Sequence, residues 1–237
     1  MVGIVLLGIF VVLLVFGAPI AVCLGMSSVG AILAQGAGKP LDAIMSVLPR
    51  LCSSASSKFV LLAIPFFILS GNVMEKAGIS GRLINLAEKC LGHIRGGMAM
   101  VCVVVSCFFA AISGSGPATV SAIGSFMIPE MEEKGYDKGY ATALSAAAGT
   151  IGVIIPPSIP FVIYGVATGT SIGDMFKAGV IPGLLMGLAL MIYNWATSKK
   201  YGWKGNGRKF NFKALGKSFI DSFWAILSPV IILGGIY

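Results

Sequence analysis

Two clusters of serine, glycine and proline interrupt otherwise apolar stretches of this sequence. The first is SGSGP at residues 113–117, and the second is PPSIP at residues 156–160. A helix that stops inside a membrane exposes unpaired carbonyl groups, and the helix that restarts exposes unpaired amide groups. Carbonyl and hydroxyl oxygens are ligands for hard cations, whereas amides at a helix N-terminus attract anions. The two clusters therefore have the means to bind a small cation and a carboxylate.

The first cluster supplies oxygens and a turn. The Ser113 and Ser115 hydroxyls, with the carbonyls of the preceding helical turn, are candidate ligands for Na⁺. Gly114 and Gly116 allow a strained turn because they have no side chain, and Pro117 suits the first turn of the following helix. We interpret residues 113–117 as the tip of a helical hairpin that carries half of a binding site.

The second cluster repeats this chemistry about forty residues later. Thr150 and Ser158 add hydroxyl groups, while Pro156 and Pro157 prevent continuous helical pairing and leave carbonyls free nearby. Two interrupted helices that meet at mid-membrane are typical of the substrate and ion site of a secondary transporter. Small residues and serines also mediate close helix packing in membranes, so a purely structural role is the alternative.

Composition places the chain in a membrane. Hydrophobic residues make up 57% of its 237 residues and charged residues only 11%, and the mean hydropathy is +0.93. Soluble domains carry about 25% charged residues. The long apolar start has no basic region before it and is too long for a cleaved signal peptide. The five cysteines have no metal-ligand spacing, and no nucleophile–base pair lies in a span, so we do not expect an enzyme.

The charge pattern predicts how the elements cross the membrane. Residues 96–129 carry no charge; their first arm, 96–112, is just long enough to span, and their second, 118–129, is too short at ~1.5 Å per residue. A re-entrant hairpin fits these lengths. The loops at 76–95, 130–138 and 199–217 then share one face, and they hold 13 of the 17 basic residues, which predicts a cytoplasmic face and explains the net charge of +8.

The expected organisation has six parts. They are N-terminal membrane and interfacial scaffold helices at 1–95, the hairpin at 96–129, a discontinuous helix at 130–175 broken at 156–160, a transmembrane helix at 176–198, a basic cytoplasmic loop at 199–217 and the start of another span at 218–237. Residues 96–129 and 139–173 contain no Asp, Glu, Lys, Arg or His. Intramembrane ionisable residues usually carry proton coupling, so Na⁺ is favoured as the coupling ion.

Several linked motifs resemble a known family. The stretch FFAAISGSGPATVSAIGSFMIPEMEEKGYDKGYATALSAAAGTIGVIIPPSIPFVIYGVATGTSIGDMFKAGVIPGLL, with AIPFFILSGNVMEKAGISGRL and GHIRGGMAM upstream, resembles the large membrane (M) subunit of tripartite ATP-independent periplasmic (TRAP) transporters. The resemblance implies an all-α, elevator-type membrane fold with two inverted repeats, each holding a re-entrant hairpin and a discontinuous helix. Ser113, Gly114 and Ser115 match the first hairpin tip, and residues 149–158, beginning at Gly149, match the adjacent broken helix.

The resemblance also implies a function and partners. It implies Na⁺-driven uptake of an organic acid, such as a C4-dicarboxylate or sialic acid, across the bacterial inner membrane. A soluble periplasmic binding protein would deliver the substrate, and a small four-helix membrane subunit would be the partner. Members of the family are about twice this length, so the sequence resembles a first repeat. A passive channel and a structural membrane subunit without an ion site are the alternatives left open.

Overall fold

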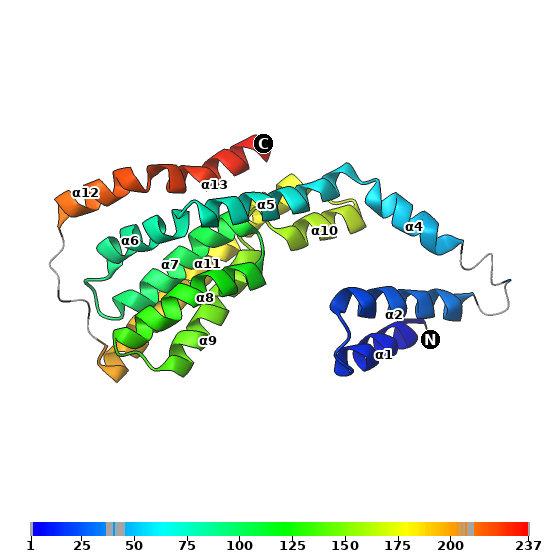
Figure 1. Cartoon of the computed structure of the whole chain (residues 1–237), viewed down its shortest axis with the longest axis horizontal. Coiled ribbons are helices and arrows are strands. Elements are labelled where there is room, and N and C mark those ends of the chain that lie inside the picture. The colour runs from blue at the N-terminus through cyan, green and yellow to red at the C-terminus, as the bar shows by residue number, and fades with distance from the viewer. Residues whose placement is uncertain are drawn as a thin grey trace. The chain divides into compact units, whose positions relative to one another are not determined.

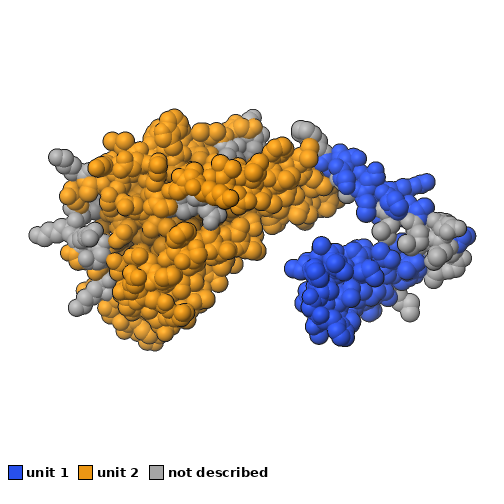
Figure 2. Space-filling model, viewed as in Figure 1, with its two compact units in different colours: residues 1–59 blue, residues 60–237 orange. Residues whose placement is uncertain are grey.

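The computed structural model describes residues 2–36, 40, 46–203, 205, 207 and 211–236, and these residues form helices and connecting segments without a strand (Figure 1). The all-helical expectation is therefore confirmed for this part of the chain. Two compact units, Met1–Phe59 and Val60–Tyr237, are coloured separately in Figure 2, and each is described by itself.

The first unit begins with a pair of packed helices, α1 (Val2–Val15) and α2 (Ile20–Gln35). The break between them falls at the GAP sequence of residues 17–19, because Gly17 adopts a positive φ of 76° and Pro19 precedes the first residue of α2. A third helix, α4 (Val47–Ser56), lies among the scaffold helices expected at 1–95, where Lys39 and Asp42 are outside the described residues.

The second unit carries the two interrupted helices. Its elements follow the short η1 (Phe59–Leu62) and are α5 (Ala63–Lys76), α6 (Ile79–Leu91), α7 (Gly97–Ser113), α8 (Gly116–Glu133), α9 (Lys138–Gly149), η2 (Thr150–Val153), α10 (Ile159–Thr168), α11 (Ile172–Tyr201), α12 (Phe212–Asp221) and α13 (Phe223–Ile236). Pro65 lies in the first turn of α5, where its missing amide hydrogen costs no hydrogen bond.

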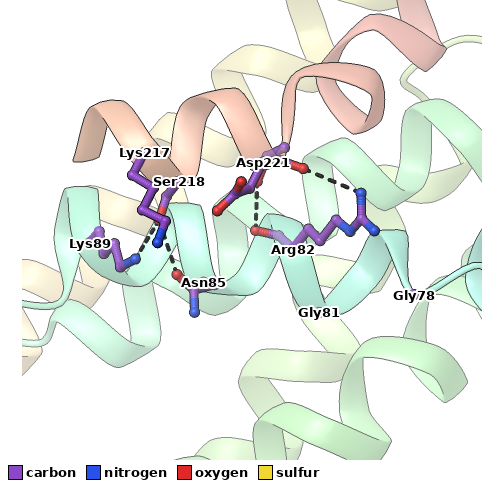
Figure 3. Close-up of a pocket in the computed structure, with 9 residues that line it drawn as sticks. Gly78, Gly81, Arg82, Asn85, Lys89, Lys217, Ser218 and Asp221 are labelled. Atoms are coloured by element: carbon purple, nitrogen blue, oxygen red, sulfur yellow. Dashed lines mark hydrogen bonds between the residues drawn. The ribbon is translucent and has the colours of Figure 1, made fainter. Parts of the chain in front are cut away.

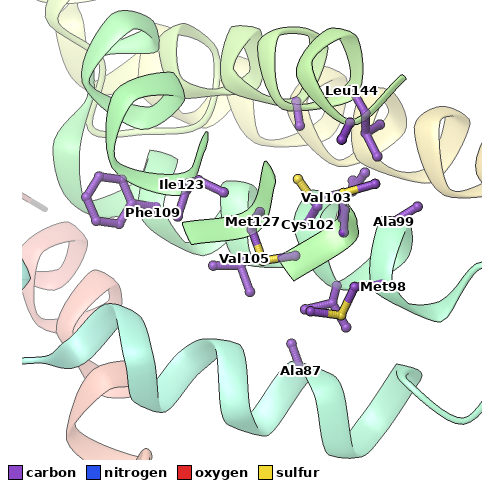
Figure 4. Packing of buried hydrophobic residues seen from close by; sticks show 14 of the residues in the cluster. Ala87, Met98, Ala99, Cys102, Val103, Val105, Phe109, Ile123, Met127 and Leu144 are labelled. Carbon is purple, nitrogen blue, oxygen red and sulfur yellow. The ribbon is translucent and has the colours of Figure 1, made fainter. Parts of the chain in front are cut away.

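Helix α7 forms the centre of the second unit. It contacts α5, α6, α8, α9, α11, α13 and η2, and its residues Val101, Cys102, Val103 and Val105 are fully buried. Figure 4 shows Cys102, Val103 and Val105 packed with Met127 of α8 and other apolar residues of the same cluster. A helix that is apolar all round is stable only when neighbours cover it on every side. The α7–α8 hairpin is therefore anchored in the core, and its tip is held at a fixed place.

Two helix boundaries differ from the sequence expectation. Helix α8 continues beyond Pro129 to Glu133 and is 18 residues long, about 27 Å, so the second arm is not shorter than the first. The sequence argument was wrong here because a proline removes one hydrogen bond without ending a helix. Helix α9 ends at Gly149, earlier than expected, since glycines and the isoleucines before Pro156 disfavour helical backbone.

Helix α11 is longer than the span expected at 176–198. It has 30 residues, about 45 Å, and begins where the Ser171 hydroxyl accepts a hydrogen bond from the Asp174 amide. Among the described residues it is the one helix long and apolar enough to cross a membrane by itself. Large apolar side chains on it, such as Ile181 and Ile192, are about two-thirds exposed, which suits contact with lipid.

Candidate functional site

The hairpin tip is built by three residues with different backbone conformations. Helix α7 ends at Ser113, Gly114 adopts a left-handed φ of 61°, and Ser115 is extended before α8 begins at Gly116. The Gly114 amide donates to the Ala110 carbonyl at 3.0 Å and closes the last turn of α7. An alanine Cβ at position 114 would lie 2.5 Å from the Pro157 carbonyl oxygen, so only glycine fits this approach.

The tip docks directly onto the interruption between α9 and α10. The Ile159 amide, the first of α10, donates to the Gly114 carbonyl at 3.0 Å. On the same segment, Ser158 is fully buried; its hydroxyl donates to the Val153 carbonyl at 2.6 Å and accepts from the Phe161 amide at 3.4 Å. The structure thus brings the SGSGP and PPSIP clusters together through their backbones.

Glycines allow the first turns of α8 to approach the interruption between α9 and α10 closely. A Cβ at Gly152 would lie 2.6 Å from the Thr119 hydroxyl oxygen and 3.0 Å from the Ser115 carbonyl oxygen. A Cβ at Gly116 would lie 3.3 Å from the Gly149 carbonyl oxygen, and one at Gly149 would overlap Val120. The hairpin and the broken helix are therefore in backbone contact over several residues.

Three oxygens form a compact triangle under the tip. The hydroxyl oxygens of Ser113 and Thr119 are 3.0 Å apart, the Thr119 hydroxyl donates to the Ser115 carbonyl at 2.8 Å, and the Ser113 hydroxyl lies 3.3 Å from that carbonyl. Thr119 is fully buried and Ser113 is 6% exposed. Ser115 takes part through its carbonyl rather than its hydroxyl. Sequence reasoning missed Thr119, although a threonine four residues after a tip serine commonly bonds back to that carbonyl.

A small cavity of about 180 Å³ lies beside the tip. Its lining residues come from α5 and α7, from the tip and from α10: Ile68, Gly71, Asn72, Phe109, Ser113, Ser115, Ala118 and Ile159. Asn72 adds an amide that donates and accepts hydrogen bonds, and it was not foreseen from the sequence because its helix lies more than thirty residues upstream. The cavity joins polar groups to an apolar wall, which is the usual composition of a small-molecule site.

One predicted residue does not face this site. Thr150 is exposed, and its hydroxyl donates back to the Ala147 carbonyl of α9 at 2.6 Å. Pro156 and Pro157 are buried and joined by a cis peptide bond, and the Pro157 carbonyl contacts the tip. The described residues contain no group of His, Cys, Asp or Glu able to hold a metal ion. The chemistry available at the site is therefore that of neutral hydroxyls, carbonyls and amides.

Comparison with known proteins shows the family to which this chain belongs. A family model described as "Tripartite ATP-independent periplasmic transporter, DctM component" matches residues 7–237. The chain belongs to this family. The resemblance expected from the sequence motifs is thus confirmed, and the relatives of this membrane-embedded family are named as transporter permeases.

Three relatives illustrate the range of the family. The isethionate TRAP transporter permease protein DctMQ of Oleidesulfovibrio alaskensis is 50% identical over 98% of this chain and 36% of its own length. The C4-dicarboxylate TRAP transporter large permease protein DctM of Vibrio cholerae is 42% identical over 95% of this chain and 49% of its own length. The sialic acid TRAP transporter large permease protein SiaM of that organism is 42% identical over 76% of this chain and 42% of its own length. The chain spans about half the length, or less, of the curated relatives it matches.

At the other end of this DctM-family unit, three connecting segments meet. Residues from the α6–α7, α8–α9 and α11–α12 connections line one cavity of about 430 Å³: Gly92, Lys134, Gly135, Tyr136, Gly202, Trp203 and Gly205 among them. These connections belong to the loops that the charge pattern assigned to one face. Lys204, Arg208 and Lys209 of the basic loop lie outside the described residues.

Trp203 joins these segments, and replacing it should loosen them. Its ring stacks on Tyr136 at 4.5 Å and on Tyr201 at 5.1 Å, and it lies 4.5 Å from Tyr140. Because each aromatic pair contributes about 0.5–1.5 kcal/mol, Trp203→Ala should lower the free energy of unfolding by about 2 kcal/mol. Thermal unfolding of the detergent-purified, full-length permease measures this, with the exposed Trp195→Ala as control. Equal shifts in the two variants would contradict the bridging role.

Proposed function

We propose that the permease containing this sequence is the large membrane subunit of a Na⁺-coupled TRAP transporter that imports a small organic anion. A periplasmic binding protein delivers the anion, and a small four-helix membrane subunit completes the complex. The observation that carries the proposal is the docking of the hairpin tip on the broken helix, where Ile159 donates to the Gly114 carbonyl. Interrupted helices that pair in this way form the ion and substrate sites of secondary transporters.

The oxygen triangle supports Na⁺ as the coupling ion. Oxygens that surround a hard cation at 2.3–2.6 Å stand roughly 3 Å apart. The edges of the triangle formed by Ser113, Ser115 and Thr119 are 3.0, 2.8 and 3.3 Å. Its neutral oxygens contrast with the carboxylates that usually carry protons in transporters. A cation bound to the triangle would replace the hydrogen bonds among these three oxygens and tie α7 to α8 through Ser113 and Thr119.

The same region favours an anion close to the cation. Helix α8 begins at the tip, so the amides of its first turn contribute positive partial charge there. The adjoining cavity offers the Asn72 amide as a further donor. The names of the relatives specify isethionate, C4-dicarboxylates and sialic acid, and isethionate carries a sulfonate. We therefore widen the substrate class from carboxylates to small organic anions with a carboxylate or a sulfonate group.

An elevator mechanism fits the close contact of hairpin and break. The contacts at Gly114, Gly149 and Gly152 leave no space for a side chain, so α7 to α10 would move as one body. Movement of that body across the membrane carries the occupied site from one side to the other. In this proposal the protein lies in the bacterial cytoplasmic membrane, with the Trp203 end of the unit toward the cytoplasm.

Uptake measurements test the proposal. Full-length permease, its small membrane subunit and the binding protein are reconstituted in proteoliposomes, and uptake of a labelled organic anion is followed with and without an inward Na⁺ gradient. We expect accumulation only when both the gradient and the binding protein are present. Uptake that persists after the gradient is collapsed would remove Na⁺ coupling, and sustained current without the binding protein would identify a channel.

A further inference from the structure

A groove between two amphipathic helices lies apart from the hairpin site. It has a volume of about 620 Å³. Its lining residues are Gly78 just before α6, Gly81, Arg82, Asn85 and Lys89 of α6, Lys217, Ser218 and Asp221 of α12, and Ser222 just after α12. Figure 3 shows the residues of α6 facing those of α12 across this space. Three cationic groups oppose one carboxylate, so the groove is electropositive.

The walls of the groove are fixed by hydrogen bonds between the helices. The Lys89 ammonium group donates to the Ser218 hydroxyl, which donates to the Asn85 side-chain oxygen at 3.2 Å. The Ser222 hydroxyl donates to the Arg82 carbonyl at 3.0 Å. Ser218 and Ser222 are buried, at 3% and 1% exposure. The two helices are therefore joined along their length, and the groove is a built feature rather than a gap between independent segments.

Its charges are not neutralised within the groove. Among the described residues, the Lys217 ammonium group has no hydrogen-bond or ion-pair partner, and the Asp221 carboxylate forms no salt bridge. Within the part of the chain that the structure describes, the Arg82 guanidinium group donates to the Asp221 backbone carbonyl alone, at a long 3.4 Å. Cationic groups that outnumber the carboxylates of a cavity and form no ion pair with them have most to gain from an anion.

The surroundings of the groove are those of a membrane interface. On α6 the polar residues Arg82, Asn85 and Lys89 share one face, while Leu83 and Leu86 are buried on the other. On the other wall, apolar side chains next to the groove are exposed: Phe219, Ile220, Phe223 and Trp224. A helix with a cationic polar face and exposed aromatic residues typically lies at the level of lipid headgroups.

We propose that this groove binds a phosphate group, with Arg82, Lys89 and Lys217 as its cationic ligands. Within the membrane this phosphate belongs to the headgroup of an anionic phospholipid, whose acyl chains lie along the exposed apolar residues of α12 and α13. Such a lipid holds α12 against α6. The site is independent of the substrate and Na⁺ chemistry at the hairpin tip, so it stands whether or not the transport proposal does.

Native mass spectrometry of the full-length permease with its small subunit tests this site. The purified complex is titrated with phosphatidylglycerol or with zwitterionic phosphatidylcholine of the same chain length. We expect preferential retention of phosphatidylglycerol, and Lys217→Gln should weaken it about fivefold, the usual effect of one basic side chain near an anionic headgroup. Asp221→Asn should strengthen it, because it removes the carboxylate that opposes the phosphate.

The control variant is Lys200→Gln, which removes the same charge from an exposed position outside the groove. Titration with inorganic phosphate separates the two sources: displacement of the lipid at millimolar phosphate identifies a free-phosphate site, and its absence identifies a headgroup site. Equal retention of the two lipids without phosphate binding overturns the proposal. Equal weakening by Lys200→Gln and Lys217→Gln does so too, because it would show only non-specific attraction.

Discussion

Gly114→Ala is expected to reduce organic-anion uptake at least about tenfold in reconstituted proteoliposomes. An alanine with the φ of 61° found at position 114 is strained by about 1–2 kcal/mol. Its Cβ would also lie 2.5 Å from the Pro157 carbonyl oxygen, which belongs to the backbone and cannot rotate away. The tip must then separate from the break and lose the Ile159 hydrogen bond to the Gly114 carbonyl. A misplacement of about 1 Å can cost about a hundredfold in rate, so a loss of at least about tenfold is expected here.

Gly169→Ala separates the two causes of this loss. Gly169 has a similar φ of 73°, but nothing lies within 4 Å of an added Cβ. This variant shares the backbone strain without the clash, so its uptake should stay within about twofold of the unmodified transporter. Uptake and thermal unfolding are measured on the same preparations. If Gly114→Ala transports as well as Gly169→Ala, the contact between tip and break is not needed for function.

Thr119→Val is expected to raise the Na⁺ concentration for half-maximal uptake about tenfold. Valine has nearly the same shape as threonine, so the packing against Gly152 is kept while the hydroxyl oxygen is lost. A lost polar contact at a buried site costs about 1–3 kcal/mol, and 1.4 kcal/mol is a factor of ten in affinity. Ser113→Ala should have a similar effect, since both hydroxyls belong to the triangle. Uptake rates over a series of Na⁺ concentrations give the shift.

Three further variants make this result specific. Thr119→Ser keeps the oxygen and should restore most of the Na⁺ affinity. Ser145→Ala removes a hydroxyl that is equally buried but contacts Cys102 at 3.7 Å, away from the tip, and should leave the Na⁺ curve unchanged. Ser115→Ala should be mild, because the triangle uses the Ser115 carbonyl, which alanine retains. A Na⁺ curve that Ser113→Ala and Thr119→Val both leave unmoved would place the cation elsewhere.

The order and type of most helices followed from local signals in the sequence. Gly17 and Pro19 lie between α1 and α2, and Leu83, Leu86 and Ala87 recur at helical spacing in α6, so residues close in the chain account for these elements. The ends of helices were harder to predict at prolines, because a proline can either end a helix or lie within one. Pro129 was expected to end the second arm but lies inside α8, because the rest of the helix keeps its hydrogen bonds.

By itself, the sequence determined that this is a membrane chain of the DctM family whose helices are interrupted at two places. Composition and single residues such as Gly114, Pro156 and Pro157 contain that information, because glycine and proline interrupt a helix at their own positions in the chain. Only the tertiary structure decided that the Gly114 carbonyl receives the Ile159 amide, that Thr119 completes the oxygen triangle and that α12 closes a basic groove on α6. These contacts join residues that are distant in the chain, or they depend on the orientation of a side chain. The packing of the helices determines both the pairing and the orientation.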